Sequence, residues 1–239
     1  MTKTRREERR EETIREIKNL AWQQLEQAGS DQLSLRKISR DMRMSSAAIF
    51  RYFDSRQTLI TALMNDAFEN LSIHISAECE KFSTQTQLEK IIIACQSYRT
   101  WALANPAQYA LIYGSPIFDY APEWQSLTNS AKGSLEIFLK LITQAWHNGE
   151  INPKASSIQL SPALISQMQA LIAARGYSAP PEILYSVIKG WTVLHGIVSL
   201  EVFKHITPIL PDPSEFFNQS ILDLLEQIGF QTQTKAPTV

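Results

Sequence analysis

Apolar residues along this chain recur mainly at steps of three and four, which is the spacing of one face of an α-helix. The first such stripe covers about 18 residues and ends at Gly29. Ser residues placed as N-caps and Gly and Pro residues placed as stops divide the remaining pattern into further helices. These predicted helices span 35–41, 46–52, 56–82, 87–104, 107–113, 123–148, 161–175, 181–205 and 214–228. No alternating strand of useful length and no fixed-period repeat occurs, so the pattern predicts an all-α protein.

Composition narrows the class of protein. The chain has 239 residues, of which 44% are hydrophobic and 20% charged, and this is ordinary globular composition. Glycine is scarce, and neither the P-loop nor the dinucleotide fingerprint occurs. The serine-hydrolase elbow and the H-E-x-x-H zinc motif are also absent. Cys79 and Cys95 form no C-x-x-C pair. We therefore expect no enzyme, no cofactor and no metal.

The chain carries no sign of export or of a membrane anchor. Its first ten residues are charged and lack the apolar core of a secretory signal. No run of about 18 apolar residues is apparent, so we expect no membrane span. A reduced, cytoplasmic setting follows, with a frayed polar tail at 231–239.

Charge is distributed unevenly along the chain. The net charge is −1, but residues 1–60 hold 13 Lys and Arg against 9 Asp and Glu, and the excess elsewhere is acidic. A basic segment on an acidic body favours a polyanionic partner. The arginines within residues 5–10 alternate with glutamates, which is consistent with either a solvated helix start or an arm that reaches DNA. The sequence leaves both readings open.

The two short helices predicted at 35–41 and 46–52 are joined by only three residues, which makes a helix-turn-helix. In that motif the second helix enters the major groove and the first braces it across the backbone. Four apolar residues have the spacing to hold the two helices together: Ile38, Met44, Ile49 and Phe53. The outward residues are then Ser46, Ala47, Phe50 and Arg51.

These outward residues suit base recognition. Small side chains at the helix start let the backbone approach the base edges, while Phe50 and Arg51 offer contact to a thymine methyl group and to guanine. Hydroxyls, amides and cations at the flanks suit phosphates. The candidate DNA-binding residues are Ser34, Arg36, Arg43, Ser45, Ser46, Ala47, Phe50, Arg51, Tyr52 and Arg56. The alternative is a helical hairpin within a bundle, with no role in DNA binding.

The segment from Leu35 to Leu59 resembles the DNA-binding domain of TetR-type transcriptional regulators. The resemblance rests on the run Phe50-Arg51-Tyr52-Phe53, followed by a polar turn, a basic residue and Leu59, and it covers about residues 10–65. It implies an all-α homodimer with a DNA-binding domain at 1–56 and an effector-binding and dimerisation domain at 57–230.

One position departs from the family pattern. The family usually has Gly in the turn, where this chain has Arg43. A left-handed conformation there would cost an Arg about 1 kcal/mol, and the side chain could contact a phosphate instead.

The C-terminal half resembles one class of TetR-family effector domains. The resemblance lies in Gly190-Trp191 … His195-Gly196 and in Tyr98-Arg99-Thr100-Trp101 ahead of Asn105-Pro106. It implies that helices 181–205 and 214–228 form a four-helix bundle with a partner subunit. The residues assigned to that interface by their periodicity are Leu184, Val187, Leu194, Val198, Phe217, Ile221 and Leu224.

Large aromatic residues in the C-terminal half suggest a pocket, because small-molecule pockets are mostly apolar and aromatic. We expect Arg99 and His195 to be its polar handles. The full set of candidate effector-binding residues is Arg99, Trp101, Tyr109, Tyr113, Phe138, Trp146, Trp191 and His195. The same residues would serve equally as a solid core, and His195 as a core or interface histidine.

These observations predict a transcriptional regulator that binds double-stranded DNA. We expect a ligand-responsive repressor that binds a pseudo-palindromic operator as a homodimer and responds to a small apolar effector. An alternative of another class is a helical adaptor without a small-molecule effector. Binding to duplex DNA that strengthens at low salt separates the two.

Overall fold

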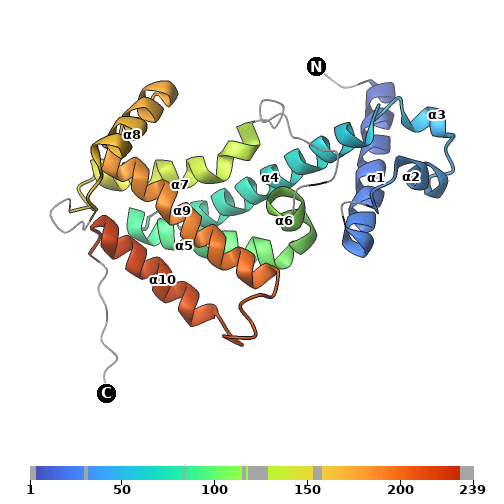
Figure 1. Cartoon of the computed structure of the whole chain (residues 1–239). Coiled ribbons are helices and arrows are strands. Elements are labelled where there is room, and N and C mark those ends of the chain that lie inside the picture. Colours follow the sequence, from blue (N-terminus) through green and yellow to red (C-terminus); the bar gives the residue numbers. More distant parts are fainter. Residues whose placement is uncertain are drawn as a thin grey trace. The chain divides into compact units, whose positions relative to one another are not determined.

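The computed structural model describes residues 4–29, 32–82, 84–114, 117, 129–152 and 158–231 (Figure 1). Within these residues the chain is helical and contains no strand, apart from one isolated bridge between Ile151 and Phe230. The predicted all-α class is therefore confirmed. The helices are α1 (Arg5–Ala28), α2 (Leu35–Asp41), α3 (Ser46–Ile49), α4 (Arg56–Lys81), α5 (Gln87–Ala104), α6 (Pro106–Tyr113), α7 (Asn129–His147), α8 (Pro162–Arg175), α9 (Pro181–Val202) and α10 (Ser214–Ile228).

Most helix limits agree with the sequence pattern to within a few residues, and two differ for identifiable reasons. Helix α1 begins at Arg5, ahead of the apolar stripe, because Thr4 and Glu7 form a reciprocal capping box. Helix α3 ends at Ile49 rather than at residue 52. The first six residues of the helix predicted at 123–148 lie outside the described residues.

The described residues form two compact units. The first unit contains α1, α2, α3, α4 as far as Asn70, and α6. Its core is apolar, with Ile17 of α1, Ile38 of α2 and Ile49 of α3 all buried. An ion pair of 2.8 Å between Lys18 Nζ and Asp66 joins α1 to α4. The first unit thus supports the two short helices on two long ones.

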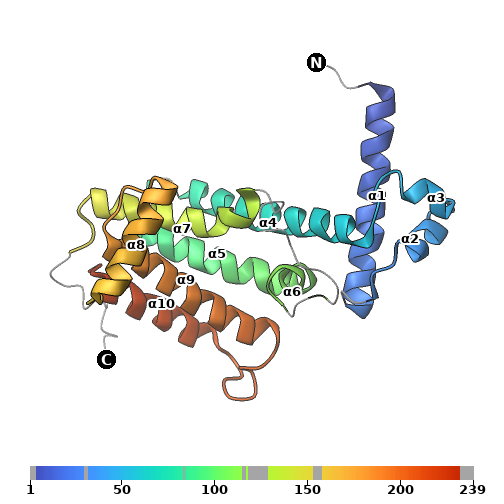
Figure 2. The same ribbon diagram turned by 45° about the horizontal axis from the view of Figure 1, so that its top comes forward.

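The second unit contains the rest of α4, together with α5, α8, α9, α10 and nearly all of α7. Helix α9 is central, because it packs against α5, α8 and α10 (Figure 2). By length and composition α9 is apolar enough to cross a membrane, a property that buried core helices share. Within the bundle its apolar character is explained by packing, since Leu184, Leu194 and Val198 are buried.

Gly229 closes the end of α10. Its φ is +108°, and a Cβ built there would lie 2.4 Å from the carbonyl oxygen of Asn152. The Gly229 carbonyl accepts a hydrogen bond of 2.9 Å from the Asn152 N–H. Only glycine combines this backbone conformation with so close a neighbour.

Candidate DNA-binding surface and effector cavity

The loop that enters α2 is held by two side chains from other helices. The buried Gln24 of α1 accepts a hydrogen bond of 3.0 Å from the Ser34 N–H through its Oε1 atom. Arg56, at the start of α4, donates from Nε to the Leu33 carbonyl oxygen at 3.2 Å. The Ser34 N–H and the Leu33 carbonyl oxygen precede α2, and these two side chains satisfy their hydrogen bonding. The two bonds therefore fix where α2 begins.

The turn between α2 and α3 is tight. Arg43 has a φ of +54°, so the left-handed conformation considered from the sequence is present. The Met44 N–H donates to the Ser39 carbonyl oxygen at 2.8 Å. The Ser45 hydroxyl then accepts from the Ala48 N–H at 3.2 Å and caps α3. The predicted N-caps at Ser34 and Ser45 are both present.

Helix α3 is one turn long and continues as a tighter turn. The N–H groups of Arg51 and Tyr52 bond three residues back, to Ala48 and Ile49, at 3.2 and 2.9 Å. This change of bonding explains why the α-helix ends before residue 52. Ile49 is fully buried, whereas Phe50 remains 46% exposed.

Side-chain exposure around α3 follows the expected pattern. The inward residues Ile38, Ile49 and Phe53 are buried, and Met44 is half-buried. The four residues expected to point outward, Ser46, Ala47, Phe50 and Arg51, are all exposed. The geometry therefore presents the surface on which base recognition was predicted, while the base contacts themselves stay a prediction.

Arg10 was not among the predicted site residues, but it supports this surface. Its guanidinium carbon lies 5.2 Å from the centre of the Tyr52 ring, which is a cation–π arrangement. Its Nη1 also donates to the Arg51 carbonyl oxygen at 3.3 Å. Arg10 thus ties α1 to the segment that follows α3. Since residues 5–28 are helical, the N-terminal arginines do not form an extended arm.

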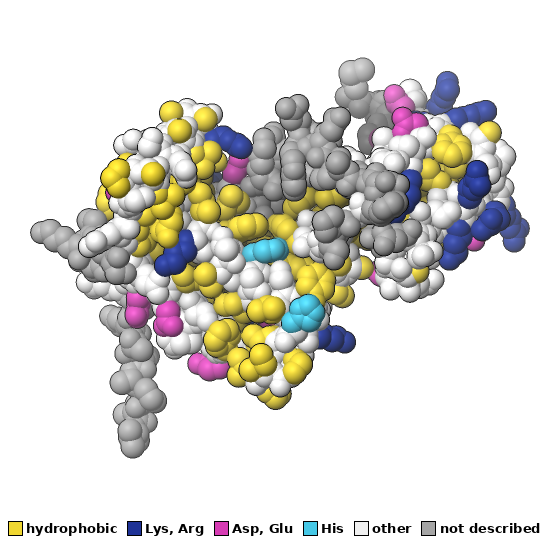
Figure 3. All heavy atoms as spheres, viewed as in Figure 1, with side chains coloured by type: hydrophobic (Ala, Val, Ile, Leu, Met, Phe, Trp, Pro, Cys, Tyr) yellow, Lys and Arg dark blue, Asp and Glu magenta, His cyan; other side chains and the backbone are white. Residues whose placement is uncertain are grey.

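The surface around α2 and α3 is positively charged. The exposed cations of α2, the turn and the segment after α3 are Arg36, Lys37, Arg40, Arg43 and Arg51, against two exposed carboxylates, Asp41 and Asp54. Figure 3 shows Lys and Arg side chains gathered at this end of the first unit. Such a surface attracts phosphates at long range. The candidates Ser34, Ser45 and Arg56 already make the structural bonds described above.

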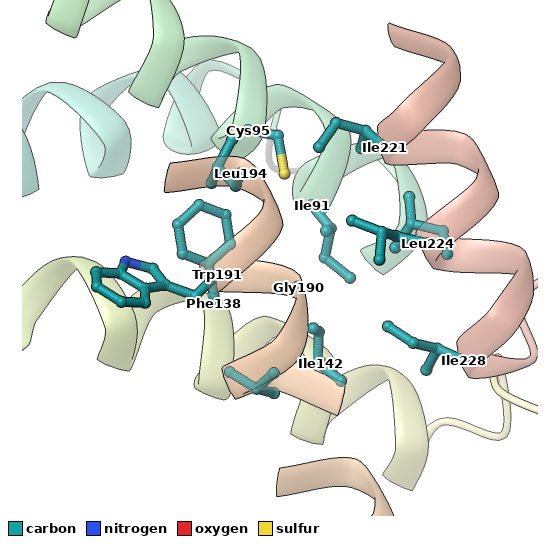
Figure 4. Close-up of a pocket in the computed structure, with 12 residues that line it drawn as sticks. Ile91, Cys95, Phe138, Ile142, Gly190, Trp191, Leu194, Ile221, Leu224 and Ile228 are labelled. Atoms are coloured by element: carbon teal, nitrogen blue, oxygen red, sulfur yellow. The ribbon is translucent and has the colours of Figure 1, made fainter. Parts of the chain in front are cut away.

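The second unit contains a small apolar cavity between α5, α7, α9 and α10 (Figure 4). Its volume is about 30 Å³, and its lining includes Cys95 of α5, Phe138 of α7, Gly190 and Trp191 of α9 and Ile221 of α10. No charged side chain lines it within the described part of the chain. A space of this size admits one or two methyl-sized groups but not a ring.

Only two of the candidate effector residues, Phe138 and Trp191, line this cavity. Tyr109 and Tyr113 belong to the first unit, where their rings lie 5.2 Å apart. Trp101 is buried and Trp146 half-buried, and neither lines the cavity.

The two expected polar handles have other partners. The Arg99 guanidinium makes two bonds to the Glu201 carboxylate, at 2.7 and 2.6 Å, and a third to the Ser214 hydroxyl. The same guanidinium lies 5.2 Å from the centre of the Phe217 ring. This network joins α5, α9 and α10. Arg99 therefore holds three helices of the bundle together.

His195 takes part in a second polar contact within the bundle. Its Nδ1 lies 3.0 Å from the hydroxyl of the buried Tyr98, and its ring stacks on Trp191 with centres 5.0 Å apart. Burial lowers the pKa of His195, because a charged imidazolium is poorly solvated there. The neutral ring thus forms part of the packing between α5 and α9.

The residues of α9 and α10 that periodicity assigned to the subunit interface pack inside the second unit of the single chain. They are therefore not available to a partner subunit. Leu184, Val187, Leu194, Val198, Phe217 and Ile221 are buried, and Leu224 is half-buried beside the cavity. Periodicity identified an apolar face correctly, but it cannot distinguish packing within a chain from packing between chains.

The sequence analysis missed Arg10, Gln24, Cys95 and Gly190. The sequence pattern showed only that Cys95 forms no C-x-x-C pair, and burial raises the pKa of its thiol to about 12. Glycine within a helix is a usable signal of an unusual site, and Gly190 carries it. Arg10 and Gln24 carry no local pattern, because their partners are far away along the chain. No cluster of three metal-ligating side chains occurs among the described residues.

Comparison with known families gives two matches. Residues 17–63 match the model of the bacterial regulatory proteins of the tetR family, and residues 91–224 match the tetracyclin repressor-like C-terminal domain. The first match includes the whole helix-turn-helix. The second includes the Gly190–Gly196 run and spans more than half of the chain.

Individual relatives agree with these matches. The HTH-type transcriptional regulator Rv1816 of Mycobacterium tuberculosis is 28% identical over 90% of this chain and 91% of its own length. The crystal structure of the regulatory protein SCO4313 has a TM-score of 0.74 at 29% identity, over 93% of this chain and 99% of that one. A Rhodococcus sp. RHA1 protein of unknown function shares the fold, with a TM-score of 0.65 at 23% identity over 90% and 95% of the two chains.

Proposed function

We propose that this chain, which belongs to the tetR family of bacterial regulatory proteins and is a DNA-binding transcriptional regulator, acts in the cytoplasm as a ligand-responsive repressor. It binds a pseudo-palindromic operator as a homodimer. The observation that carries the proposal is the exposed surface of Ser46, Ala47, Phe50 and Arg51 on a buried scaffold, surrounded by cations. A surface so placed suits the major groove.

Within this surface we assign different tasks to different residues. Arg51 reads a base, most simply guanine through its O6 and N7 atoms, and Phe50 lies against a thymine methyl group. Arg36 and Arg43 contact phosphates, because their exposed cations lie on α2 and in the turn, beside α3 rather than on it. The Tyr52 ring is held by Arg10, and its hydroxyl donates a hydrogen bond to a phosphate of the DNA backbone. Phosphate contacts set position and base contacts set specificity.

The homodimer requires a face that the single chain leaves open. On α9, Thr192, Gly196, Leu200 and Phe203 recur at steps of four and three and so share one side of the helix. Leu200 is 44% and Phe203 37% exposed, and Phe216 of α10 is 46% exposed. A Cβ built on Gly196 meets nothing within 4 Å, so a partner helix can approach closely. We assign the two-fold interface to this outward face.

Repression and its release follow from linkage between two sites. An effector in the second unit relieves repression only if it binds the DNA-free conformation more tightly than the DNA-bound one. DNA must then weaken effector binding by the same factor. A change in the distance between the two recognition segments, which must fit grooves about 34–36 Å apart, would supply that difference.

The test is selection of bound duplexes from a random pool by the purified full-length chain. We expect an enriched site with two inverted half-sites, and affinity that falls as salt rises. Recovery of a single unsymmetrical half-site would contradict the homodimer on DNA. Failure to enrich any sequence at low salt would contradict the assigned reading surface.

A further inference from the structure

A second space lies beside the apolar cavity of the second unit. A groove of about 230 Å³ lies between α5 and α10 and is lined by Ile92, Cys95, Gln96, Phe217, Asn218, Ile221 and Leu222. Cys95 and Ile221 line both the cavity and the groove. In Figure 4 these two side chains lie close together at one end of the cavity, on the facing helices α5 and α10. Among the described residues, Cys95 and Ile221 are the two that both linings share.

The cavity and the groove differ in chemistry. The cavity lining is apolar, and its volume of about 30 Å³ is too small for a ring. The groove adds two exposed amides, Gln96 and Asn218, which offer hydrogen-bond donors and acceptors. Among the residues that the structure describes, neither lining contains a charged side chain. A charged group placed in either space would therefore have no partner.

We infer that the cavity and the groove are the two ends of one ligand site, whose occupant is a neutral amphiphile with a narrow aliphatic tail. The tail enters the cavity between Cys95 and Ile221, and the uncharged polar head stays in the groove beside Gln96 and Asn218. This deepens the proposed function, on which it rests, by naming the chemical class of the effector.

Arg99, whose guanidinium lies against the groove residue Phe217, does not favour an anionic head. Arg99 reaches Phe217 from one turn along α5, but its guanidinium already holds the Glu201 carboxylate in two bonds. Drawing a ligand anion to Arg99 would leave the Glu201 carboxylate, itself largely buried, without that partner. An alcohol or another neutral head requires no such exchange.

The site suggests how a ligand reaches the rest of the molecule. Helix α10 presents Ile221 and Asn218 toward α5, whereas Phe216 belongs to the outward face assigned to the partner subunit. A tail that separates Cys95 from Ile221 must displace α10 relative to α5. Effector binding would thus act on the helix that carries part of the subunit interface.

Gly190 offers a direct way to block the cavity. It lines the cavity on α9, and a Cβ built on it meets nothing within 4 Å, so a longer side chain can occupy that space. Ala170 is an exposed residue of α8 that lines neither the cavity nor the groove. Ala170→Leu is therefore the control for Gly190→Leu. Gly190→Ala adds one methyl group and favours the helix, so it provides a second variant that should fold.

The experiment measures binding of hexan-1-ol, octan-1-ol and decan-1-ol to the purified full-length chain by calorimetry and by the shift in melting temperature. We expect affinity to rise about fourfold for each added methylene until the cavity and the apolar walls of the groove are filled. Alkanoates and alkylammonium ions of the same length should bind more weakly than the alcohols, by a factor of about ten at least. Gly190→Leu should lose about tenfold or more in affinity, Gly190→Ala should favour shorter tails, and Ala170→Leu should bind as the original chain does.

Three results would overturn the inference. They are binding of no alcohol, equal binding of the charged analogues, and unchanged binding by both Gly190 variants. A separate measurement on the selected operator distinguishes this failure from failure of the proposed function. If alcohols bind in a Gly190-dependent manner without releasing DNA, the ligand site stands and the ligand-responsive repressor fails. If operator binding is normal and no alcohol binds, the ligand site fails and the proposed binding of the operator stands.

Discussion

The two units of this protein use the same kind of helix in opposite ways. In the first unit the residues around α3 that are proposed to contact DNA are exposed, and buried neighbours such as Ile38 and Ile49 hold the segment in place. In the second unit the most regular apolar face, on α9, is buried inside the chain. An outward functional surface is thus marked by polar and small residues among apolar ones. A helix that is apolar on several sides does not reveal which side meets a partner.

The largest expected effect separates the inward and outward faces of α9. Leu194→Glu places a carboxylate in the core of the second unit and should lower the free energy of unfolding by several kcal/mol, on the order of 3–5. Leu200→Glu, on the exposed face, should leave the fold intact and weaken the dimer. Urea unfolding and sedimentation velocity measure the two outcomes. A stable, folded monomer from Leu194→Glu would reverse the assignment of the faces.

The contrast also explains what sequence alone can predict. Helix limits such as those of α2, α5 and α10 follow from local capping and periodicity, so they were predicted closely. The outward residues of α3 followed from their spacing around Ile49. The cavity, the Arg99–Glu201 pair and the contact between Arg10 and Tyr52 join residues far apart along the chain. No local pattern records such partners, because they depend on how the helices pack.

Arg10 tests whether the first unit depends on a distant helix for the position of its reading surface. Arg10→Ala removes the cation–π contact with Tyr52 and the bond to the Arg51 carbonyl oxygen. We expect a loss of about 1 kcal/mol in stability and a two- to fivefold loss, roughly, in operator affinity. Arg9→Ala, one position away and exposed, serves as the control. Equal effects of the two variants would mean that only net charge matters.

The turn of the helix-turn-helix provides a smaller effect of opposite sign. Arg43 adopts a φ of +54°, a conformation that glycine accepts without strain. Arg43→Gly should therefore raise the free energy of unfolding by at most about 1 kcal/mol, offset in part by the greater entropy of the unfolded chain. If Arg43 contacts a phosphate, the same variant should weaken binding to all duplexes alike. Thermal unfolding and binding to non-operator DNA separate the two effects.

The smallest expected effect concerns pH and the second unit. Burial lowers the pKa of His195 below its ordinary value of 6.5, so the folded chain holds this proton less tightly than the unfolded chain. The stability that the neutral ring contributes is therefore present above about pH 6.5 and is lost as the pH falls below it. His195→Gln should reduce the difference between the free energies of unfolding, measured in urea, at about pH 8 and about pH 5.5. His205→Gln, which alters an exposed histidine, should leave that difference unchanged.

The central claim, that the chain reads DNA through the surface beside α3, is tested most directly by Arg51. Binding of Arg51→Ala to the selected operator and to an unrelated duplex can be compared by fluorescence anisotropy, with Arg175→Ala, an exposed arginine of α8, as the control. We predict that Arg51→Ala loses about 1–3 kcal/mol on the operator and little on the unrelated duplex, so that one position of each half-site is relaxed. Equal losses on both duplexes, or no loss on the operator, would contradict the account.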